Sequence, residues 1–477
     1  PSLKGQTHFA SGLRDALGRE VFDDTTTSDA DLEGSRITLT IDVNVQSAAE
    51  AELEKAVRER SAAGGYVVVM DPSNGDILAL ANYPTFDPND PAKYPAANRN
   101  NQALTNPFEP GSTMKSILLA SALQEKVVKP EDRFDCENGR WPLGSRVIHD
   151  VHGKGVLDLN DVIKYSSNIC SAKIGLKLGR ERWHAKLRDF GFGEITGITL
   201  PAETRGLLPN VSRWADISTA TISFGQGISV SALQMVAALS TIANGGDWVR
   251  PNIMKRVTNQ KGDLVKDFPP EIVRKVLDRQ VARKATEILT SVTKPGGTGT
   301  QAAMEGFDVA GKTGTALKVD RLTRNYSPDK HLGLFIGFMP AENPRLVVLV
   351  VIDEPKGVQY GGVVAAPAFK AISTVALKNS GVFAKTDKPI TAVRTPETGD
   401  EEEKAGDGYD ENEPRIAATT EEVPNFLGLP LRRVIEMGSG AGIDLEVEGS
   451  GRAVSQDPAP GAKYRSGKRC RVTFSKG

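Results

Sequence analysis

Residues 109–124 read EPGSTMKSILLASALQ, and this stretch decides the fold assignment. Pro110 and Gly111 end the preceding segment, which predicts a helix that begins near Ser112 and continues to Gln124. The residues after Lys115 are mostly apolar. The pattern therefore places a serine, a lysine and the start of a helix at one point of the fold.

Ser112 and Lys115 are three residues apart, so they share one face of the helix and the amine can reach the hydroxyl. A serine hydroxyl needs a neighbouring base, and a lysine can serve when burial and nearby cations lower its pKa. The helix N-terminus adds positive potential where an oxyanion would form. A second Ser-x-x-Lys match, at residues 291–294, runs into Pro295-Gly296-Gly297, so we interpret it as a chance occurrence.

Two further polar clusters could complete a site. Residues 166–168 (Ser-Ser-Asn) lie inside a helical pattern over 162–178, and a hydroxyl and an amide there could shuttle a proton and hold a substrate amide. Residues 312–315 (Lys-Thr-Gly-Thr) begin a strand, where a cation and two hydroxyls could bind a carboxylate. Gly314 would let a substrate backbone approach the strand edge. Each cluster alone is a weak signal.

The surrounding pattern predicts one α/β domain over residues 36–385. A strand precedes Asp42, which can cap the next helix, and residues 66–80 form a hairpin. Helical patterns dominate residues 110–246, and residues 331–352 form a second hairpin. Because strands enclose a helical middle, we expect the first and last strands to share one sheet.

Three shorter regions flank this domain. Residues 1–35 are polar and turn-prone, and we interpret them as the remnant of an upstream domain. Residues 386–422 are acidic with almost no large apolar side chains, so they predict a flexible linker. Residues 423–477 regain strand and helix patterning, enough for one small module.

The composition excludes several classes of function. With a formal net charge of -1, the chain has no basic surplus to replace counterions on nucleic acid. No apolar run approaches the roughly 18 residues of a membrane span. His149 and His152 lack a nearby third ligand, so a polar loop is favoured over a metal site. The three cysteines form no disulfide framework, although a Cys136–Cys170 bridge is possible in an oxidising compartment.

Taken together and in this order, the three motifs resemble those of penicillin-binding proteins and class A β-lactamases. The resemblance covers residues 36–380 and is strongest to class B penicillin-binding proteins of the cell-division type. It extends to residues 101–115, 224–227 (Phe-Gly-Gln-Gly) and 360–367 (Tyr-Gly-Gly to Ala-Ala-Pro). Residues 423–477 resemble a PASTA domain, marked by 423–426 (Val-Pro-Asn-Phe) and 455–461 (Ser-Gln-Asp-Pro-Ala-Pro-Gly).

The resemblance implies a transpeptidase domain with a central antiparallel sheet flanked by helices, and a small α+β PASTA domain. It also implies that residues 1–35 belong to an N-terminal pedestal or dimerisation domain. In the implied reaction Ser112 attacks the penultimate D-alanine of a stem peptide, and an amine of a second stem peptide resolves the acyl-enzyme. The implied roles are Lys115 as base, Ser166 and Asn168 as proton relay, Lys312 as a positive charge, Thr313, Gly314 and Thr315 as substrate-binding residues, and the N–H groups of Ser112 and Thr315 as oxyanion hole.

The resemblance implies no cofactor or metal. The implied partners are stem peptides from lipid-linked precursors, β-lactam antibiotics, a membrane glycosyltransferase and other division proteins, with no nucleic acid. The chain begins with Pro1 rather than methionine, so we expect sequence upstream of it. The resemblance implies that a membrane anchor lies there. The expected location is the extracytoplasmic, periplasmic face of the inner membrane.

Several alternatives remain open at this point. A β-lactam sensor and a sporulation-specific relative would use the same motifs. A D,D-carboxypeptidase is a less favoured alternative. A β-lactamase needs a carboxylate to activate water, and the nearest candidate segment, residues 203–206 (Glu-Thr-Arg-Gly), does not match the expected pattern. A Ser-His-Asp hydrolase would need a Gly-x-Ser-x-Gly elbow, which Ser112 lacks.

Overall fold

The computed structural model describes residues 13–14, 20–21, 34–319, 326–382, 422–429, 434, 437–438, 441, 443, 445–449, 452–464 and 469–475. It divides into two compact units, Pro1–Lys385 and Thr386–Gly477. Within the first 33 residues it describes only the paired strands β1 (Leu13–Arg14) and β2 (Glu20–Val21). The expected N-terminal remnant and the acidic linker lie almost wholly outside the described residues, so both stay predictions.

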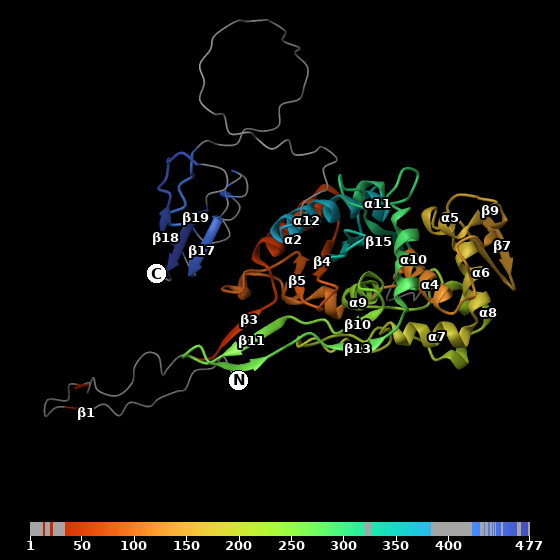
Figure 1. Cartoon of the computed structure of the whole chain (residues 1–477), viewed down its shortest axis with the longest axis horizontal. Coiled ribbons are helices and arrows are strands. Elements are labelled where there is room, and N and C mark those ends of the chain that lie inside the picture. Colours follow the sequence, from red (N-terminus) through yellow and green to blue (C-terminus); the bar gives the residue numbers. More distant parts are fainter. Residues whose placement is uncertain are drawn as a thin grey trace, which may run out of the picture. The chain divides into compact units, whose positions relative to one another are not determined.

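A five-stranded antiparallel sheet forms the centre of the first unit (Figure 1). Its order is β14 (Ala310–Val319), β15 (Tyr326–Met339), β16 (Leu346–Asp353), β4 (Gly64–Met70) and β5 (Ile77–Tyr83). Because β16 pairs with β4, the first and last hairpins of the domain share one sheet, as predicted. The first strand, β3 (Arg36–Leu39), does not join them, because it pairs with β11 (Met254–Thr258) in a separate three-stranded sheet. β14 is an edge strand, so its Lys-Thr-Gly-Thr motif lies where one side of the strand is open to a ligand.

Helices cover both faces of this sheet. On one face pack α2 (Val43–Glu59), α11 (Gly361–Val364) and α12 (Ala366–Asn379), and on the other α4 (Met114–Gln124), α9 (Ala232–Ala243) and α10 (Arg279–Thr290). β16 is buried on both sides, which explains its uninterrupted apolar run. The predicted cap of α2 is confirmed, because the Asp42 carboxylate accepts from the N–H groups of Asn44 and Val45.

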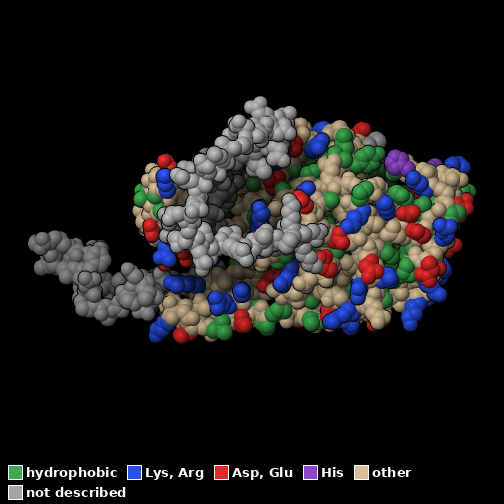
Figure 2. Space-filling view, turned by 45° about the horizontal axis from the view of Figure 1, so that its top comes forward, with side chains coloured by type: hydrophobic (Ala, Val, Ile, Leu, Met, Phe, Trp, Pro, Cys, Tyr) green, Lys and Arg blue, Asp and Glu red, His purple; other side chains and the backbone are tan. Residues whose placement is uncertain are grey.

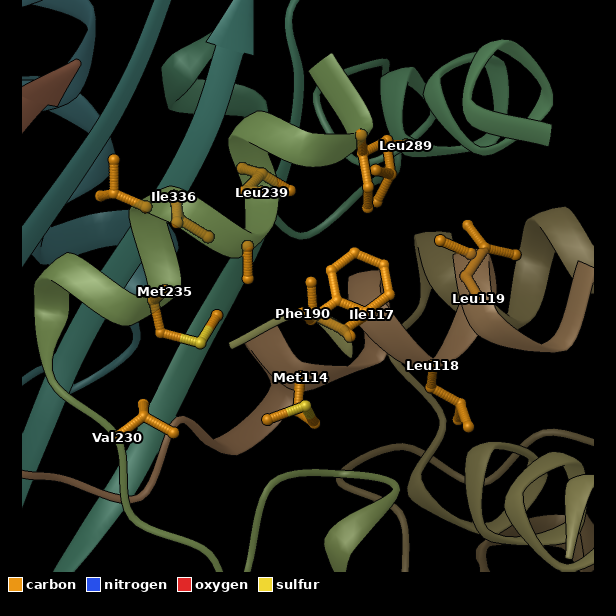
Figure 3. Close-up of a cluster of buried hydrophobic side chains, with 14 of the residues drawn as sticks. Met114, Ile117, Leu118, Leu119, Phe190, Val230, Met235, Leu239, Leu289 and Ile336 are labelled. Carbon is orange, nitrogen blue, oxygen red and sulfur yellow. The ribbon is translucent and has the colours of Figure 1, made fainter. Parts of the chain in front are cut away.

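α4 is buried on every side. Figure 3 shows its apolar side chains among residues from α9, α10 and β15. A helix that is apolar all round requires a protein interior. The same helix carries Lys115, so packing α4 into the core places a lysine there as well, fully buried.

The helix predicted over residues 162–178 is wrong, because the structure has two helices there. α5 (Leu159–Lys164) ends before the motif, and α6 (Asn168–Leu178) begins within it. Ser166 has a left-handed backbone with φ 62°, and the Ser167 hydroxyl caps α6 by accepting from the Cys170 N–H. The polar triplet is therefore a break between helices rather than part of one.

The remaining strands and helices of the first unit are short. They are β3 (Arg36–Leu39), α3 (Gln102–Thr105), β6 (Arg133–Asp135), β7 (Arg140–Leu143), β8 (Arg146–His149), β9 (Val156–Asp158), α7 (Arg180–Asp189), α8 (Asp216–Ile222), β10 (Asp247–Val249), β11 (Met254–Thr258), β12 (Leu264–Asp267) and β13 (Ile272–Lys275).

The second unit contains a three-stranded sheet of β17 (Leu445–Gly449), β19 (Cys470–Ser475) and β18 (Arg452–Asp457), in that order. β17 and β19 run parallel, and β18 and β19 antiparallel. Its small core includes Phe426 and Cys470, which is an unpaired thiol.

Charges of both signs are interspersed over the coloured surface in Figure 2, as expected from the near-neutral net charge. None of the helices described is long and apolar enough to cross a membrane.

A core substitution tests the packing of α12 on the sheet. Phe369 is fully buried, and its ring lies edge-on to Phe335 with centroids 4.6 Å apart. We expect Phe369→Ala to lower the free energy of unfolding by about 3–5 kcal/mol in denaturant titrations. Val375→Ala, on the same helix at an exposed position, should cost less than about 1 kcal/mol. Equal losses for the two variants would contradict this packing.

Candidate active site

A cavity of about 380 Å³ collects the three motifs. The predicted site residues in its lining are Ser112, Ser166, Asn168, Thr313, Gly314 and Thr315. Lys115 and Lys312 are fully buried, and both contact Ser166. The structure thus brings together a turn before α4, the break between α5 and α6, and the edge strand β14.

Ser112 lies in a 3₁₀ turn, Gly111–Thr113, that leads into α4. The Thr113 hydroxyl donates to the Pro110 carbonyl at 2.6 Å, and the Gly111 N–H donates to the Gly225 carbonyl at 3.2 Å. Gly225 has φ 84°, and a Cβ there would lie 2.1 Å from the Gly111 oxygen. This close backbone contact explains why the segment beside the nucleophile turn carries glycine.

One serine hydroxyl joins the two buried lysines. Ser166 Oγ lies 3.1 Å from Lys115 Nζ and 3.0 Å from Lys312 Nζ. Lys115 Nζ also donates to the Ser166 carbonyl at 2.6 Å and to Asn168 Oδ1 at 2.8 Å. The left-handed backbone of Ser166 thereby presents both its carbonyl and its hydroxyl to Lys115.

Burial shifts the pKa of both lysines downward. Desolvation lowers the pKa of Lys115 well below its ordinary value, the charge of Lys312 lowers it further, and Asp150 raises it. Desolvation lowers the pKa of Lys312 to about 7. Lys115 therefore loses its proton more readily than an exposed lysine does, as a general base must, while Lys312 still holds its proton for part of the time near pH 7.

Asp150 holds the start of α6. Its carboxylate accepts from the Ser167 hydroxyl at 2.6 Å, the Asn168 N–H at 2.5 Å and the Ile169 N–H at 3.0 Å. A carboxylate at a helix N-terminus is favoured by the helix dipole. The sequence analysis missed Asp150 because it considered only the histidines on either side as ligands. The described residues contain no group of three metal-ligating side chains.

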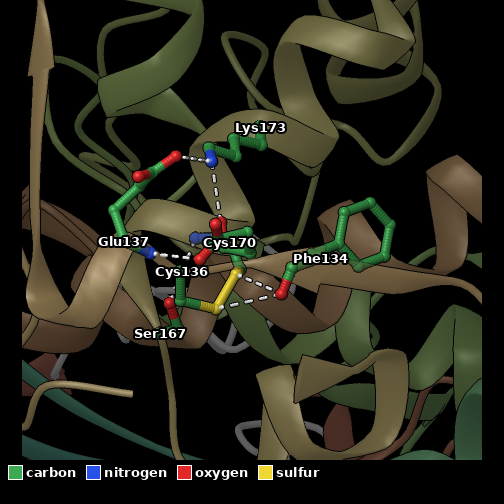
Figure 4. Close-up of polar contacts among 7 residues, drawn as sticks. Phe134, Cys136, Glu137, Ser167, Cys170 and Lys173 are labelled. Atoms are coloured by element: carbon green, nitrogen blue, oxygen red, sulfur yellow. Dashed lines mark hydrogen bonds and ion pairs between the residues drawn. A yellow bond between two sulfur atoms is a disulfide. The ribbon is translucent and has the colours of Figure 1, made fainter. Parts of the chain in front are cut away.

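A disulfide joins Cys136 and Cys170, with Cα atoms 5.2 Å apart (Figure 4). The sequence analysis left this pairing open, because 34 residues separate the two. Beside the bridge Lys173 donates to the Asp135 carbonyl at 2.7 Å and to Glu137 at 2.6 Å. These contacts tie the first turns of α6 to the segment after β6.

The Lys-Thr-Gly-Thr strand packs directly on the nucleophile turn. A Cβ at Gly314 would lie 2.4 Å from Leu334 and 2.9 Å from Thr113, so this glycine is required by packing, a reason that the sequence analysis missed. Thr313 Oγ1 lies 2.8 Å from Thr298 Oγ1. Thr298 also lines the cavity, although nothing in the sequence indicated it.

Two segments that the sequence pattern did not favour as catalytic, the second Ser-x-x-Lys match and residues 203–206, lie outside the cavity. Ser291 donates to the Ile288 carbonyl at 2.7 Å, and Lys294 pairs with Asp308, so the second Ser-x-x-Lys match is structural. Glu203 accepts from the N–H groups of Thr196 and Gly197, at 2.7 and 3.1 Å, and does not line the cavity.

Comparisons with known proteins agree with this geometry. Residues 65–374 match the family described as the penicillin binding protein transpeptidase domain, and residues 421–476 match the PASTA domain. The chain is 36% identical over 396 residues to a probable peptidoglycan D,D-transpeptidase PenA of Neisseria flavescens, covering 83% of this chain and 95% of that protein. It spans 66% of the length of the Neisseria meningitidis PenA, at 37% identity.

Other similarities come from sporulation and division proteins and from solved structures. Stage V sporulation protein D of Bacillus subtilis is 34% identical, over 98% of this chain and 70% of that protein. The transpeptidase domain of Burkholderia pseudomallei penicillin-binding protein 3 is 34% identical with a TM-score of 0.64, over 73% of this chain and 98% of that one. Penicillin-binding protein 3 of Mycobacterium tuberculosis, complexed with aztreonam, is 30% identical with a TM-score of 0.70, over 74% of this chain and 81% of that one.

The two lysines predict a bell-shaped pH dependence of acylation. The second-order rate with a penicillin should rise as Lys115 loses its proton and fall above about pH 7 as Lys312 loses its own. In Lys312→Arg the guanidinium stays charged, so the fall at high pH should disappear. The maximal rate should still be lower, because a planar guanidinium does not occupy the place of the ammonium. A high-pH fall that persists in this variant would contradict the role of Lys312.

Asp150→Asn tests how the cap of α6 affects the base. Because the Asp150 charge raises the pKa of Lys115, its removal should move the rising limb of the acylation profile to lower pH. The loss of charged hydrogen bonds should also lower the free energy of unfolding by about 1–2 kcal/mol. Asp158→Asn is a matched control, since Asp158 caps α5 by accepting from the Asp161 N–H at 2.8 Å. Asp158→Asn should lower the free energy of unfolding but leave the rising limb of the acylation profile at the same pH. If the limb shifted equally in both variants, this role of Asp150 would be excluded.

Proposed function

Because the chain belongs to the penicillin-binding protein transpeptidase family, we propose that it is a peptidoglycan D,D-transpeptidase that forms cross-links through an acyl-enzyme on Ser112. The observation that carries this proposal is the Ser166 hydroxyl, within 3.1 Å of two buried lysines beside the cavity that Ser112 lines. A nucleophile, a base with a lowered pKa and a proton relay are the groups that acyl transfer requires.

In the acylation step the Ser112 oxygen bonds to the carbonyl carbon of the penultimate D-alanine. Its proton passes to Lys115 and through Ser166 to the nitrogen of the departing D-alanine, as the C–N bond breaks. The N–H groups of Ser112 and Thr315 stabilise the oxyanion, a contribution of about 3 kcal/mol for such a donor. Lys312, Thr313 and Thr315 bind the terminal carboxylate of the donor peptide, while Asn168 orients its amides.

In the second step an amine of another stem peptide attacks the acyl carbon. A C–N bond forms, the bond to the Ser112 oxygen breaks, and the relay returns a proton from the amine to that oxygen. β-Lactams acylate Ser112 in the same way. The M. tuberculosis relative complexed with aztreonam supports this reading. Glu203, the carboxylate nearest to a deacylating base in the sequence, accepts from backbone N–H groups and does not line the cavity, which favours a transpeptidase over a β-lactamase.

The biological setting that we propose is septal cell-wall synthesis on the extracytoplasmic face of the membrane. The similarity to the peptidoglycan D,D-transpeptidase FtsI of Escherichia coli, 34% identical over 80% of this chain and 62% of that protein, supports it. We propose a membrane glycosyltransferase and division proteins as partners, and a structural or localising role for the PASTA domain.

A sporulation-specific role is the second candidate, because the B. subtilis sporulation protein matches 98% of the chain. Deleting the gene separates the two, since only the first predicts failed septation in growing cells.

The proposed activity is tested by intact-mass spectrometry with a penicillin. We expect a single adduct that forms on the wild type, persists for minutes or longer, and is absent from Ser112→Ala. Ser291→Ala, in the unrelated Ser-x-x-Lys match, should label normally. With a stem pentapeptide donor, the wild type should release D-alanine and the Ser112 variant should not. Turnover of the penicillin near the roughly 10 per second of a median enzyme would instead indicate a β-lactamase.

A further inference from the structure

Glu109 lies between two neighbouring cavities. It lines the catalytic cavity together with Ser112, and it also lines a second cavity of about 510 Å³. Leu317 is likewise shared by both walls. The volume of the second cavity lies in the range of sites for small ligands or peptide side chains. Other residues that line the second cavity are Tyr66, Phe108, Lys318, Leu332 and Asp353.

The two cavities differ in charge. Beside the catalytic cavity lie the two buried lysines, which suit the carboxylate of a donor peptide. In the second cavity the Lys318 ammonium is already paired with Asp353 and Glu354, each at 2.8 Å. Among the charged residues that line the second cavity, Lys318 therefore balances Asp353, and the carboxylate of Glu109 remains. The second cavity therefore favours a cation.

Glu109 retains capacity to bind such a cation. Its Oε1 accepts from the Gly227 N–H and the Tyr326 hydroxyl, both at 2.9 Å, whereas Oε2 accepts, among the residues that the structure describes, from the Tyr326 hydroxyl alone, at 3.0 Å. A carboxylate can accept about four hydrogen bonds, so Oε2 has an open position. No described cation lies within salt-bridge distance of Glu109. Partial burial, the largest effect, raises its pKa, as expected for a carboxylate that lacks a cationic partner.

The proposed reaction needs a second substrate whose reacting group is an amine. The donor brings an anion to the lysines, whereas the acceptor brings an ammonium, so the two substrates require opposite charges on opposite sides of Ser112. We propose that Glu109 binds the ammonium of the acceptor stem peptide, whose side chain occupies the second cavity. This inference rests on the proposed transpeptidase function. The bound ammonium releases one proton to water before its nitrogen attacks the acyl carbon, and the relay carries the second proton to the Ser112 oxygen as the C–O bond breaks.

In the test, a thioester donor forms the acyl-enzyme, and stem tripeptides with lysine or diaminopimelate as the third residue are added as acceptors. The products of aminolysis and of hydrolysis are then measured. The ratio of aminolysis to hydrolysis is independent of the acylation rate. We expect this ratio to fall at least tenfold in Glu109→Gln, and the acceptor concentration for half-maximal aminolysis to rise at least tenfold. Glutamine keeps the size, and its one oxygen can accept from the Gly227 N–H and the Tyr326 hydroxyl, but the charge is removed. Glu109→Asp should recover part of the ratio.

Two control variants separate binding from a structural role. Tyr326→Phe removes a partner of Glu109 but keeps the carboxylate, so the ratio should change less than threefold. Glu203→Gln alters a glutamate that also accepts two backbone N–H groups but lines neither cavity, and it should leave the ratio unchanged. An unchanged ratio in Glu109→Gln, or an equal fall in Tyr326→Phe, would overturn the inference while the transpeptidase function stands. A wild type that forms no acyl-enzyme would overturn the function itself.

Discussion

The contact of Ser166 Oγ with the Nζ atoms of two buried lysines is the interaction on which the rest of the site depends. A buried lysine loses its hydration and needs protein oxygens to replace it. For Lys115 these are the carbonyl and hydroxyl of Ser166 and the amide oxygen of Asn168. The left-handed backbone at Ser166 presents both of its oxygens to Lys115, and the helix is broken at this residue. The break in turn requires a cap, which Ser167 and Asp150 provide.

The same burial differentiates the two lysines. Burial lowers the pKa of both lysines. The charge of Lys312 lowers the pKa of Lys115 further, which favours Lys115 as the base. Two titratable groups whose pKa values are driven apart by their surroundings can divide the roles of base and of positive charge. The second cavity, which shares Glu109 and Leu317 with the catalytic cavity, is lined by the carboxylates of Glu109 and Asp353. The proposed acceptor site thus differs in charge from the lysines beside Ser112.

The frame around the site is rigid because each motif lies on a different, well-packed element. α4 is buried on all sides, and β14 is fixed to β15 along its length. The start of α6 is held by the Cys136–Cys170 bridge and by Asp150. Glycines at 225 and 314 allow these elements to touch where any side chain would separate them.

The sequence by itself determined the features that depend on near neighbours along the chain. These are the cap of α2 at Asp42, the buried helix after Ser112, the two hairpins, and the three motifs whose order indicated the family. Periodicity and capping act within a few residues, so they are readable from the chain. Only the tertiary structure decided the break at Ser166, the pairing of Cys136 with Cys170, the cap by Asp150 and the place of Glu109 between two cavities. Each of these depends on contacts between segments far apart in sequence, which form only when the sheet and the helices pack together.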